Sequence, residues 1–132
     1  MKKILIIDDE PSIIEIYSIA LKAAKFLVVT AESGAGGLEK ALAEKPDLIL
    51  LDISMPDMDG FEMLEKLRQE NEYGKKVPVI LLTNLSAGGK EDFIEKVAKT
   101  GPMFYIVKSN FTPDKVIEKV KECLGLNYNI DV

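Results

Sequence analysis

The sequence predicts an α/β fold in which five parallel strands form one doubly wound sheet with helices on both faces. Five short apolar runs are separated by segments with helical periodicity, and this alternation is typical of repeated βα units. The runs are continuously apolar rather than alternating, which indicates strands buried on both faces. Four of them end at acidic, hydroxyl or lysine side chains. We place the strands at residues 3–7, 26–31, 47–51, 79–82 and 104–107.

Two predicted helices follow the first two strands. Pro11 begins the first helix, because the N–H group that proline lacks has no helical partner at that position. Ser33 caps the second helix, which stops before Pro46. The inward-facing residues are Ile13, Tyr17, Ala20, Leu21 and Ala24 in the first helix and Leu38, Ala41 and Leu42 in the second.

Three further helices complete the predicted set. The third spans residues 61–69, and Gly74 and Pro78 belong to the connection that follows it. The fourth ends at Gly101, and Thr112 caps the fifth. Their inward-facing residues are Phe61, Leu64 and Leu67, then Phe93, Ile94, Val97 and Ala98, and finally Val116, Ile117, Val120, Cys123 and Leu124.

Length and composition predict one domain. The chain has 132 residues, which is near the common size of a single domain. Its 47% hydrophobic and 30% charged residues are those of an ordinary globular protein. We expect a single domain over residues 1–132, with a core at about 2–125 and a short tail at 126–132.

Composition also excludes several classes of function. The net charge of −5 argues against direct binding to nucleic acid. Because the chain has no histidine, it cannot form a histidine-based triad or zinc site. Cys123 is the single cysteine, which predicts a buried structural thiol in a reducing compartment. No apolar run approaches the roughly 18 residues that cross a bilayer, so we expect a cytoplasmic protein without a membrane partner.

Polar side chains at the strand ends form a candidate site. Asp8 and Asp9 follow the first strand, Asp52 the third, Thr83 the fourth and Lys108 the fifth. Because parallel strands share a direction, these side chains lie along one edge of the sheet. Two carboxylates at about 4 Å repel each other by about 4 kcal/mol at an effective dielectric near 20, and a magnesium ion relieves that repulsion. The set therefore suits one divalent cation and one phosphoryl group.

This ordered set resembles the receiver domain of two-component response regulators and is similar to the stand-alone chemotaxis regulators among them. The resemblance rests on Asp8-Asp9, the LDISMPDMDG segment at 51–60, Thr83 and the YIVK segment at 105–108, and it covers nearly the whole chain. It implies a flavodoxin-like sheet in the order 2-1-3-4-5 with five helices. The first and third strands are then neighbours at the switch point where such sheets bind ligands.

The resemblance also implies a magnesium site. Magnesium prefers oxygen ligands and retains waters beside one or two carboxylates, so Asp9 and Asp52 are the expected direct ligands. Asp8 acts mainly through water. The family resemblance adds the backbone carbonyl of Ser54 as a further ligand.

In the family that this chain resembles, the residue at Asp52 is the phosphoacceptor. Its carboxylate attacks a phosphohistidine on a sensor histidine kinase or a histidine phosphotransfer protein, which gives an aspartyl phosphate. Lys108 and Thr83 bind phosphoryl oxygens. Thr83 and Tyr105 then act as a switch that reshapes the face of the fourth helix, fifth strand and fifth helix for a downstream protein.

Such a domain is a signalling module rather than an enzyme, although it assists its own phosphorylation and autodephosphorylation. We expect a monomer, or a weak dimer on phosphorylation, without direct contact to nucleic acid. Two alternatives remain open. A magnesium-dependent phosphatase of the haloacid-dehalogenase type also has an aspartate nucleophile, but typically carries a second aspartate where Ser54 stands. The other alternative is a receiver-like binding module that is not phosphorylated.

Some residues have a plainer interpretation or depart from the family pattern. In an ordinary turn, Gly60 supplies backbone freedom to the segment that begins at Asp57. Taken alone, Lys108 is equally a solvated lysine, and Tyr105 is more often a core aromatic. Ser109 stands where the family commonly has a proline after a cis peptide bond. A cis bond before any other residue costs about 3 kcal/mol, which leaves the Lys108–Ser109 isomer and the entry to the fifth helix open.

Overall fold

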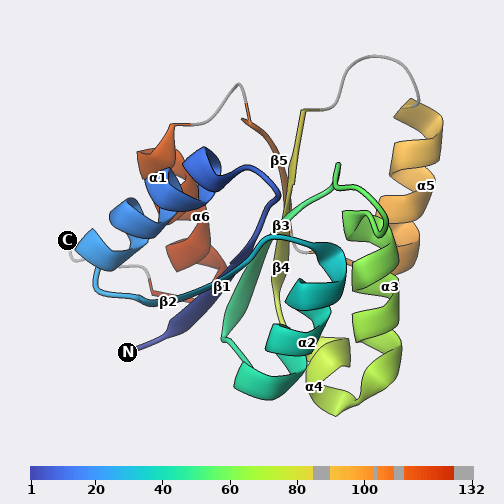
Figure 1. Cartoon of the computed structure of the whole chain (residues 1–132), viewed down its shortest axis with the longest axis horizontal. Helices are drawn as coiled ribbons and strands as arrows, with labels where there is room; N and C mark the ends of the chain where they lie inside the picture. The colour runs from blue at the N-terminus through green and yellow to red at the C-terminus, as the bar shows by residue number, and fades with distance from the viewer. Residues whose placement is uncertain (85–89, 103, 109–111, 127–132) are drawn as a thin grey trace.

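In the computed structural model, one parallel five-stranded sheet forms the centre of the fold (Figure 1). The structure describes residues 1–84, 90–102, 104–108 and 112–126. The strand order is β2-β1-β3-β4-β5 with all neighbours parallel, which confirms the predicted topology. The strand ends agree with the predicted ones to within one residue. The strands are β1 (Lys3–Ile7), β2 (Leu27–Ala31), β3 (Leu48–Asp52), β4 (Val79–Thr83) and β5 (Phe104–Val107).

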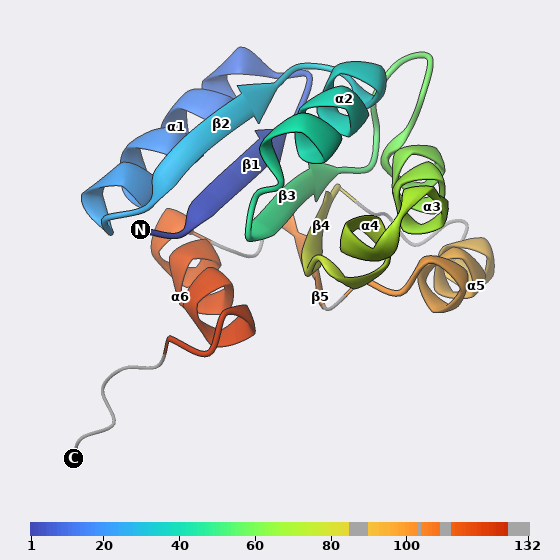
Figure 2. The same cartoon turned by 90° about the horizontal axis from the view of Figure 1, so that it is seen from below.

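Helices cover both faces of the sheet, as predicted, but the described part of the chain contains six helices rather than five. They are α1 (Pro11–Ala23), α2 (Gly34–Glu44), α3 (Gly60–Glu70), α4 (Glu72–Lys76), α5 (Lys90–Thr100) and α6 (Pro113–Cys123). Helices α1 and α6 lie on one face, and α2 to α5 lie on the other (Figures 1 and 2). The predicted fourth and fifth helices therefore correspond to α5 and α6.

The additional helix is α4, in the segment that was predicted to be a plain connection. Asn71 caps it, because its side-chain oxygen accepts a hydrogen bond from the Gly74 N–H at 2.7 Å. Gly74 is buried in this helix, and a Cβ atom there would collide with the carbonyl oxygen of Leu67 in α3. The missing side chain lets α4 pack directly against the end of α3. Its five residues are too few to show helical periodicity in the sequence.

Each face of the sheet has its own hydrophobic core. Leu5 and Ile7 of β1 pack with residues of α2 and α3, whereas the alternate residues Ile4 and Ile6 pack with residues of α1 and α6. All four side chains have zero exposure, and burying each contributes about 1.5–3 kcal/mol. None of the helices in the described part of the chain is long and apolar enough to span a bilayer.

Local sequence signals set several helix ends as predicted. The Ser33 hydroxyl accepts a hydrogen bond from the Gly36 N–H at 3.0 Å, and the Thr112 hydroxyl accepts one from the Lys115 N–H at 3.4 Å. Cys123 is half-buried against the core under α1 and α6, and burial raises the pKa of its thiol to about 11. That pKa fits the predicted structural thiol, because a thiol is a weak nucleophile until it ionises.

Candidate functional site

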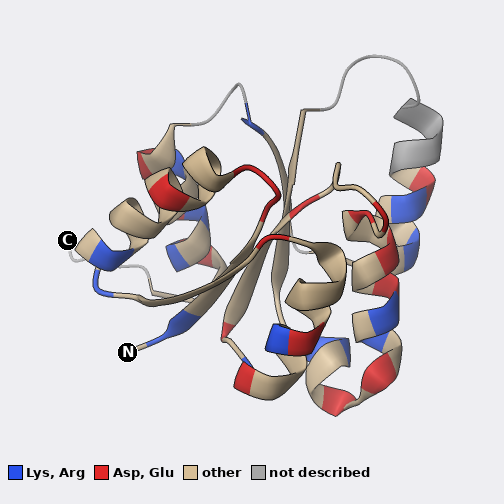
Figure 3. Cartoon of the chain, viewed as in Figure 1, with Lys and Arg blue, Asp and Glu red and all other residues tan. Residues whose placement is uncertain are grey.

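The register of the parallel strands brings the predicted site residues to one edge of the sheet. Ile7 in β1 pairs with Leu51 in β3, so the next residues, Asp8 and Asp52, lie side by side. Thr83 in β4 pairs with Val107 in β5, and Lys108 follows directly. Figure 3 shows the acidic segments after β1 and β3 meeting where these strands end. The site is therefore a product of the sheet topology.

Three aspartates form an acidic cluster at this edge. Carboxylate oxygens of Asp8, Asp9 and Asp52 all lie within 4.8 Å of one another. Asp8 has no exposure and Asp52 is only 2% exposed, whereas Asp9 is exposed. Two carboxylates are thus held out of water beside a third that faces the solvent.

Lys108 is the cation that balances this cluster. Its Nζ atom lies 3.0 Å from Asp8 Oδ2 and 3.2 Å from Asp52 Oδ1, and its side chain is only 9% exposed. The interpretation of Lys108 as a solvated lysine is therefore wrong. Burial alone would lower its pKa, but the hydrogen bond to Asp8 and the charges of Asp52 and Asp8 raise the pKa above its ordinary value.

The carboxyl group of Asp52 responds to the same surroundings. Burial, followed by the nearby charge of Asp8, raises the pKa of Asp52 to about 6, against the opposing effect of Lys108. One ammonium group therefore does not compensate for two buried carboxylates and an exposed third. The unbalanced negative charge is the feature that favours a bound divalent cation.

Thr83 and Tyr105 occupy different environments. Thr83 is 5% exposed at the carboxyl end of β4, next to the position of Asp52 in the neighbouring strand. Tyr105 lies in the edge strand β5 and is 50% exposed, so its interpretation as a core aromatic is wrong.

The loop between β3 and α3 gives a different role to Gly60 from the one predicted. Asp57, not Gly60, adopts the positive φ of this loop, at 68°. Gly60 is required by close packing instead, because a Cβ atom would collide with the carbonyl oxygen of Asp52. The Gly60 N–H also donates to the Ile53 carbonyl at 2.9 Å, and the Asp59 side chain caps α3 by accepting from Glu62 N–H. This packing fixes the chain that leaves Asp52.

Glu10 also belongs to the site, although sequence reasoning missed it. Its Oε1 atom lies 3.5 Å from Lys108 Nζ, and its backbone N–H donates to Asp8 Oδ1 at 2.9 Å. The run of three acidic residues at 8–10 was the available signal, but only the first two were assigned to the site. Ser54, the predicted carbonyl ligand, is exposed in the loop after β3. Ser109, on which the peptide-isomer question depends, lies outside the described residues.

Comparison with known proteins identifies a family for this arrangement. The protein-family model for the response regulator receiver domain matches residues 4–121 of this chain. The alkaline phosphatase synthesis transcriptional regulatory protein PhoP of Bacillus subtilis is 38% identical over 125 residues, which cover 93% of this chain and 48% of that protein. The phosphate regulon transcriptional regulatory protein PhoB of Pseudomonas aeruginosa is 35% identical over 93% of this chain and 52% of its own. The chain thus spans about half the length of the curated relatives it matches.

Solved structures agree with this relationship. The chemotaxis protein CheY4 of Vibrio cholerae superposes with a TM-score of 0.82 at 30% identity, over 92% of this chain and 98% of that one. The response regulator TrrA of Thermotoga maritima, solved in complex with magnesium and beryllofluoride, gives a TM-score of 0.78 at 35% identity with the same coverage of both chains. With the matched family model, the strand order and these neighbours in agreement, the chain belongs to the receiver domain family of two-component response regulators.

Proposed function

We propose that this receiver domain accepts a phosphoryl group on Asp52 from a phosphohistidine of a sensor histidine kinase or a histidine phosphotransfer protein. The observation that carries the proposal is the buried Asp52 carboxylate, held beside two other aspartates and 3.2 Å from Lys108. We further propose that these residues act as one cytoplasmic receiver domain whose contacts are with proteins. The net charge of −5 supports protein contacts over nucleic acid for this part of the molecule.

The donor set fits a magnesium ion. Both Asp8 oxygens already accept hydrogen bonds, from Lys108 Nζ and from the Glu10 N–H, which supports a role for Asp8 through water. Asp9 is exposed and Asp52 faces the same cluster, so these two carboxylates would hold the ion directly, with the Ser54 carbonyl as a further ligand. When bound, magnesium supplies positive charge that draws phosphoryl oxygens towards Asp52.

The proposed transfer is an in-line displacement at phosphorus. An Asp52 carboxylate oxygen forms a bond to phosphorus while the bond from phosphorus to the histidine nitrogen breaks, and the imidazole leaves with the electron pair and takes up a proton. The Lys108 ammonium and the Thr83 hydroxyl bind oxygens of the transferred group. Because the pKa of Asp52 is about 6, its carboxylate is largely ionised, and therefore nucleophilic, near neutral pH.

We propose that the output surface comprises α5, β5 and α6. Thr83 lies at the end of β4, and Val107, with which it pairs, is two residues from Tyr105 on the same face of the edge strand. A shift of the Thr83 hydroxyl towards a phosphoryl oxygen would alter the packing beside Tyr105, whose half-exposed ring would then turn inward. That change would present a new surface to a downstream protein, or to a second copy in a weak dimer.

Phosphorylation with a small donor tests the proposal. The protein is incubated with acetyl phosphate, with and without magnesium, and the mass of the intact chain is measured. We expect one added phosphoryl group in the wild type with magnesium, and none without magnesium or in Asp52→Asn. The matched control is Asp47→Asn, which changes a half-buried aspartate at the other end of β3 and should be labelled normally.

The same experiment separates the two alternatives. Sustained hydrolysis of small phosphate esters, dependent on Asp52, would identify a phosphatase of the haloacid-dehalogenase type. A wild-type chain that binds partners but takes up no phosphoryl group and no beryllofluoride would identify a binding module. Either result would overturn the proposed function.

A further inference from the structure

The ammonium group of Lys108 lies within ion-pair distance of three carboxylates. The distances from Nζ are 3.0 Å to Asp8, 3.2 Å to Asp52 and 3.5 Å to Glu10. In the proposed function, the same ammonium must bind an oxygen of the arriving phosphoryl group. Three carboxylates already share this one ammonium group, so the phosphoryl oxygen has to compete with them for it.

The three partners differ in what their release would cost. The side chains of Asp8 and Asp52 are 0% and 3% exposed, and a carboxylate left unpaired at such depth keeps the full penalty of its lost hydration. The Glu10 side chain is 56% exposed and makes the longest of the three contacts. Water replaces the ammonium at an exposed carboxylate with little loss of free energy. Glu10 is therefore the partner that exchanges most readily.

The backbone holds Glu10 in place for this contact. Glu10 occupies the N-cap position of α1, yet its side chain makes no capping hydrogen bond. Its carbonyl accepts the Ile13 and Ile14 N–H groups at 3.0 and 3.2 Å, and its own N–H is bound by Asp8. The peptide is thus fixed from both sides, while the carboxylate is directed to Lys108 rather than to the helix.

We propose that Glu10 is the exchangeable partner of Lys108, a positioning residue whose carboxylate pairs with the ammonium group in the resting protein and is displaced by a phosphoryl oxygen. This inference rests on the proposed function and adds a control on the rate of phosphoryl transfer to Asp52. Glu10 does not touch the reacting atoms. Competition from the Glu10 carboxylate slows transfer of the phosphoryl group to Asp52 and weakens the binding of that group by Lys108.

The test compares phosphorylation rates of four proteins with acetyl phosphate at saturating magnesium, which removes any effect of Glu10 on metal affinity. Glu10→Gln abolishes the competing charge, and Glu10→Asp keeps the charge but shortens the reach towards Lys108 by one methylene. Glu32→Gln is the control, because Glu32 is an exposed acid that follows β2 at the same edge and has no ion pair within the described chain. The affinity for beryllofluoride, a mimic of the phosphoryl group, is measured in parallel.

We expect both Glu10 variants to be phosphorylated about two- to fivefold faster than the wild type, which is the range set by loss of one exposed ion pair. Both should also bind beryllofluoride more tightly, whereas Glu32→Gln should behave as the wild type. If Glu10→Asp stays at the wild-type rate while the two Gln variants are equally fast, the effect is general repulsion and the inference is overturned. Unchanged or slower rates in both Glu10 variants also overturn it. Absence of any Asp52-dependent labelling in the wild type would overturn the proposed function as well.

Discussion

Two partly buried cations lie at opposite ends of the sheet and are bound in different ways. At the carboxyl end, Lys108 contacts three carboxylates. At the amino end, Arg68 of α3 donates to four backbone carbonyls, those of Gly74, Val77, Thr100 and Gly101, at 2.7–3.2 Å. These carbonyls belong to α4 and the residue after it, and to the last residue of α5 and the residue after it. The partners that Arg68 binds are neutral carbonyls, whereas the carboxylates around Lys108 exceed its single positive charge.

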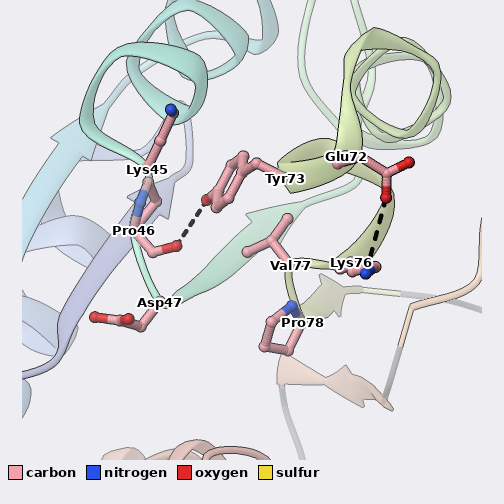
Figure 4. Close-up of a pocket in the computed structure, with 8 residues that line it drawn as sticks. All are labelled: Lys45, Pro46, Asp47, Glu72, Tyr73, Lys76, Val77 and Pro78. Carbon is pink, nitrogen blue, oxygen red and sulfur yellow. Dashed lines mark hydrogen bonds and ion pairs between the residues drawn. The ribbon is translucent and has the colours of Figure 1, made fainter.

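The surroundings of the two cations extend this contrast. A pocket of about 400 Å³ at the amino end is lined by Lys45, Asp47, Glu72 and Lys76 together with Pro46, Tyr73, Val77 and Pro78 (Figure 4). Its charged groups are of both signs, with Glu72 and Lys76 paired at 3.8 Å on the surface, and the Tyr73 hydroxyl donates to the Pro46 carbonyl at 2.7 Å. At the carboxyl end, by contrast, Asp8 and Asp52 are buried and negative charge is in excess. Charged residues alone do not make a functional site; burial and imbalance do.

The largest effect should come from removing each cation in turn. Without magnesium, Lys108→Met leaves two buried carboxylates without a cation and should lower the free energy of unfolding by about 3 kcal/mol. Arg68→Met leaves four carbonyls without this donor, and water can bind some of them. It should lower the free energy of unfolding by about 2 kcal/mol. Urea denaturation followed by circular dichroism measures both.

Magnesium should then separate the two variants. An ion that binds only the folded state stabilises it by about 2.7 kcal/mol at a hundredfold excess over its dissociation constant. We expect magnesium to restore the free energy of unfolding of Lys108→Met, whose acidic cluster is intact. In Arg68→Met, magnesium should raise the free energy of unfolding by no more than it does in the wild type. Equal responses of the two variants would show that the contrast between the cations is incorrect.

Neutralising one aspartate at each end should change stability in opposite directions. Burial raises the pKa of Asp52 to about 6, so the charged carboxylate opposes folding near neutral pH. Without magnesium, Asp52→Asn should therefore stabilise the protein by about 1–2 kcal/mol at about pH 7. Asp47 instead accepts the Lys3 N–H at 2.7 Å, and Asp47→Asn should cost up to about 1 kcal/mol.

The pH dependence of the free energy of unfolding shows whether the ionised Asp52 carboxylate stabilises or destabilises the fold. A folded-state pKa above the unfolded value means that the folded protein binds the proton more tightly, so the wild type gains stability as the pH falls from about 7 through 6 towards 4. The advantage of Asp52→Asn should therefore shrink over this range and disappear near pH 4. An advantage that grows on acidification would contradict the environment assigned to Asp52.

The smallest effect is expected at the pocket of the amino end. Tyr73→Phe removes the hydroxyl that donates to the Pro46 carbonyl and should lower the free energy of unfolding by about 1 kcal/mol. The rate of phosphorylation by acetyl phosphate should stay at the wild-type value, because the pocket lies at the far end of the sheet. A changed rate would mean that the two ends are coupled.

Much of this architecture was predictable because strand ends carry their own signals. Continuous apolar runs located the strands, and their parallel direction predicted that Asp8, Asp52 and Lys108 lie at one edge of the sheet. The strand order came from family resemblance, since the alternation of strands and helices permits several orders. Helix caps at Ser33 and Thr112 were local and therefore readable.

The remaining features depend on contacts that a linear pattern does not contain. The contact of Glu10 with Lys108 joins segments from opposite ends of the chain, and the acidic run at 8–10 places Glu10 near the site without specifying its partner. From the sequence, Gly60 was assigned a role in backbone freedom. In the structure a glycine is required there because a Cβ atom would collide with the Asp52 carbonyl oxygen. The helix α4 had a readable cap at Asn71, but Gly74 and Pro78 suggested a turn. Close packing between elements decided each of these cases.

The ion pair between Lys108 and Asp8 joins positions 100 residues apart. A ribosome therefore exposes the first acidic residues long before the lysine that completes their surroundings has been synthesised. An incomplete chain, or one whose last strand has detached, lacks the ammonium group that the proposed function assigns to binding the phosphoryl group. If the proposed function holds, only a chain that has folded through its last strand can be phosphorylated efficiently.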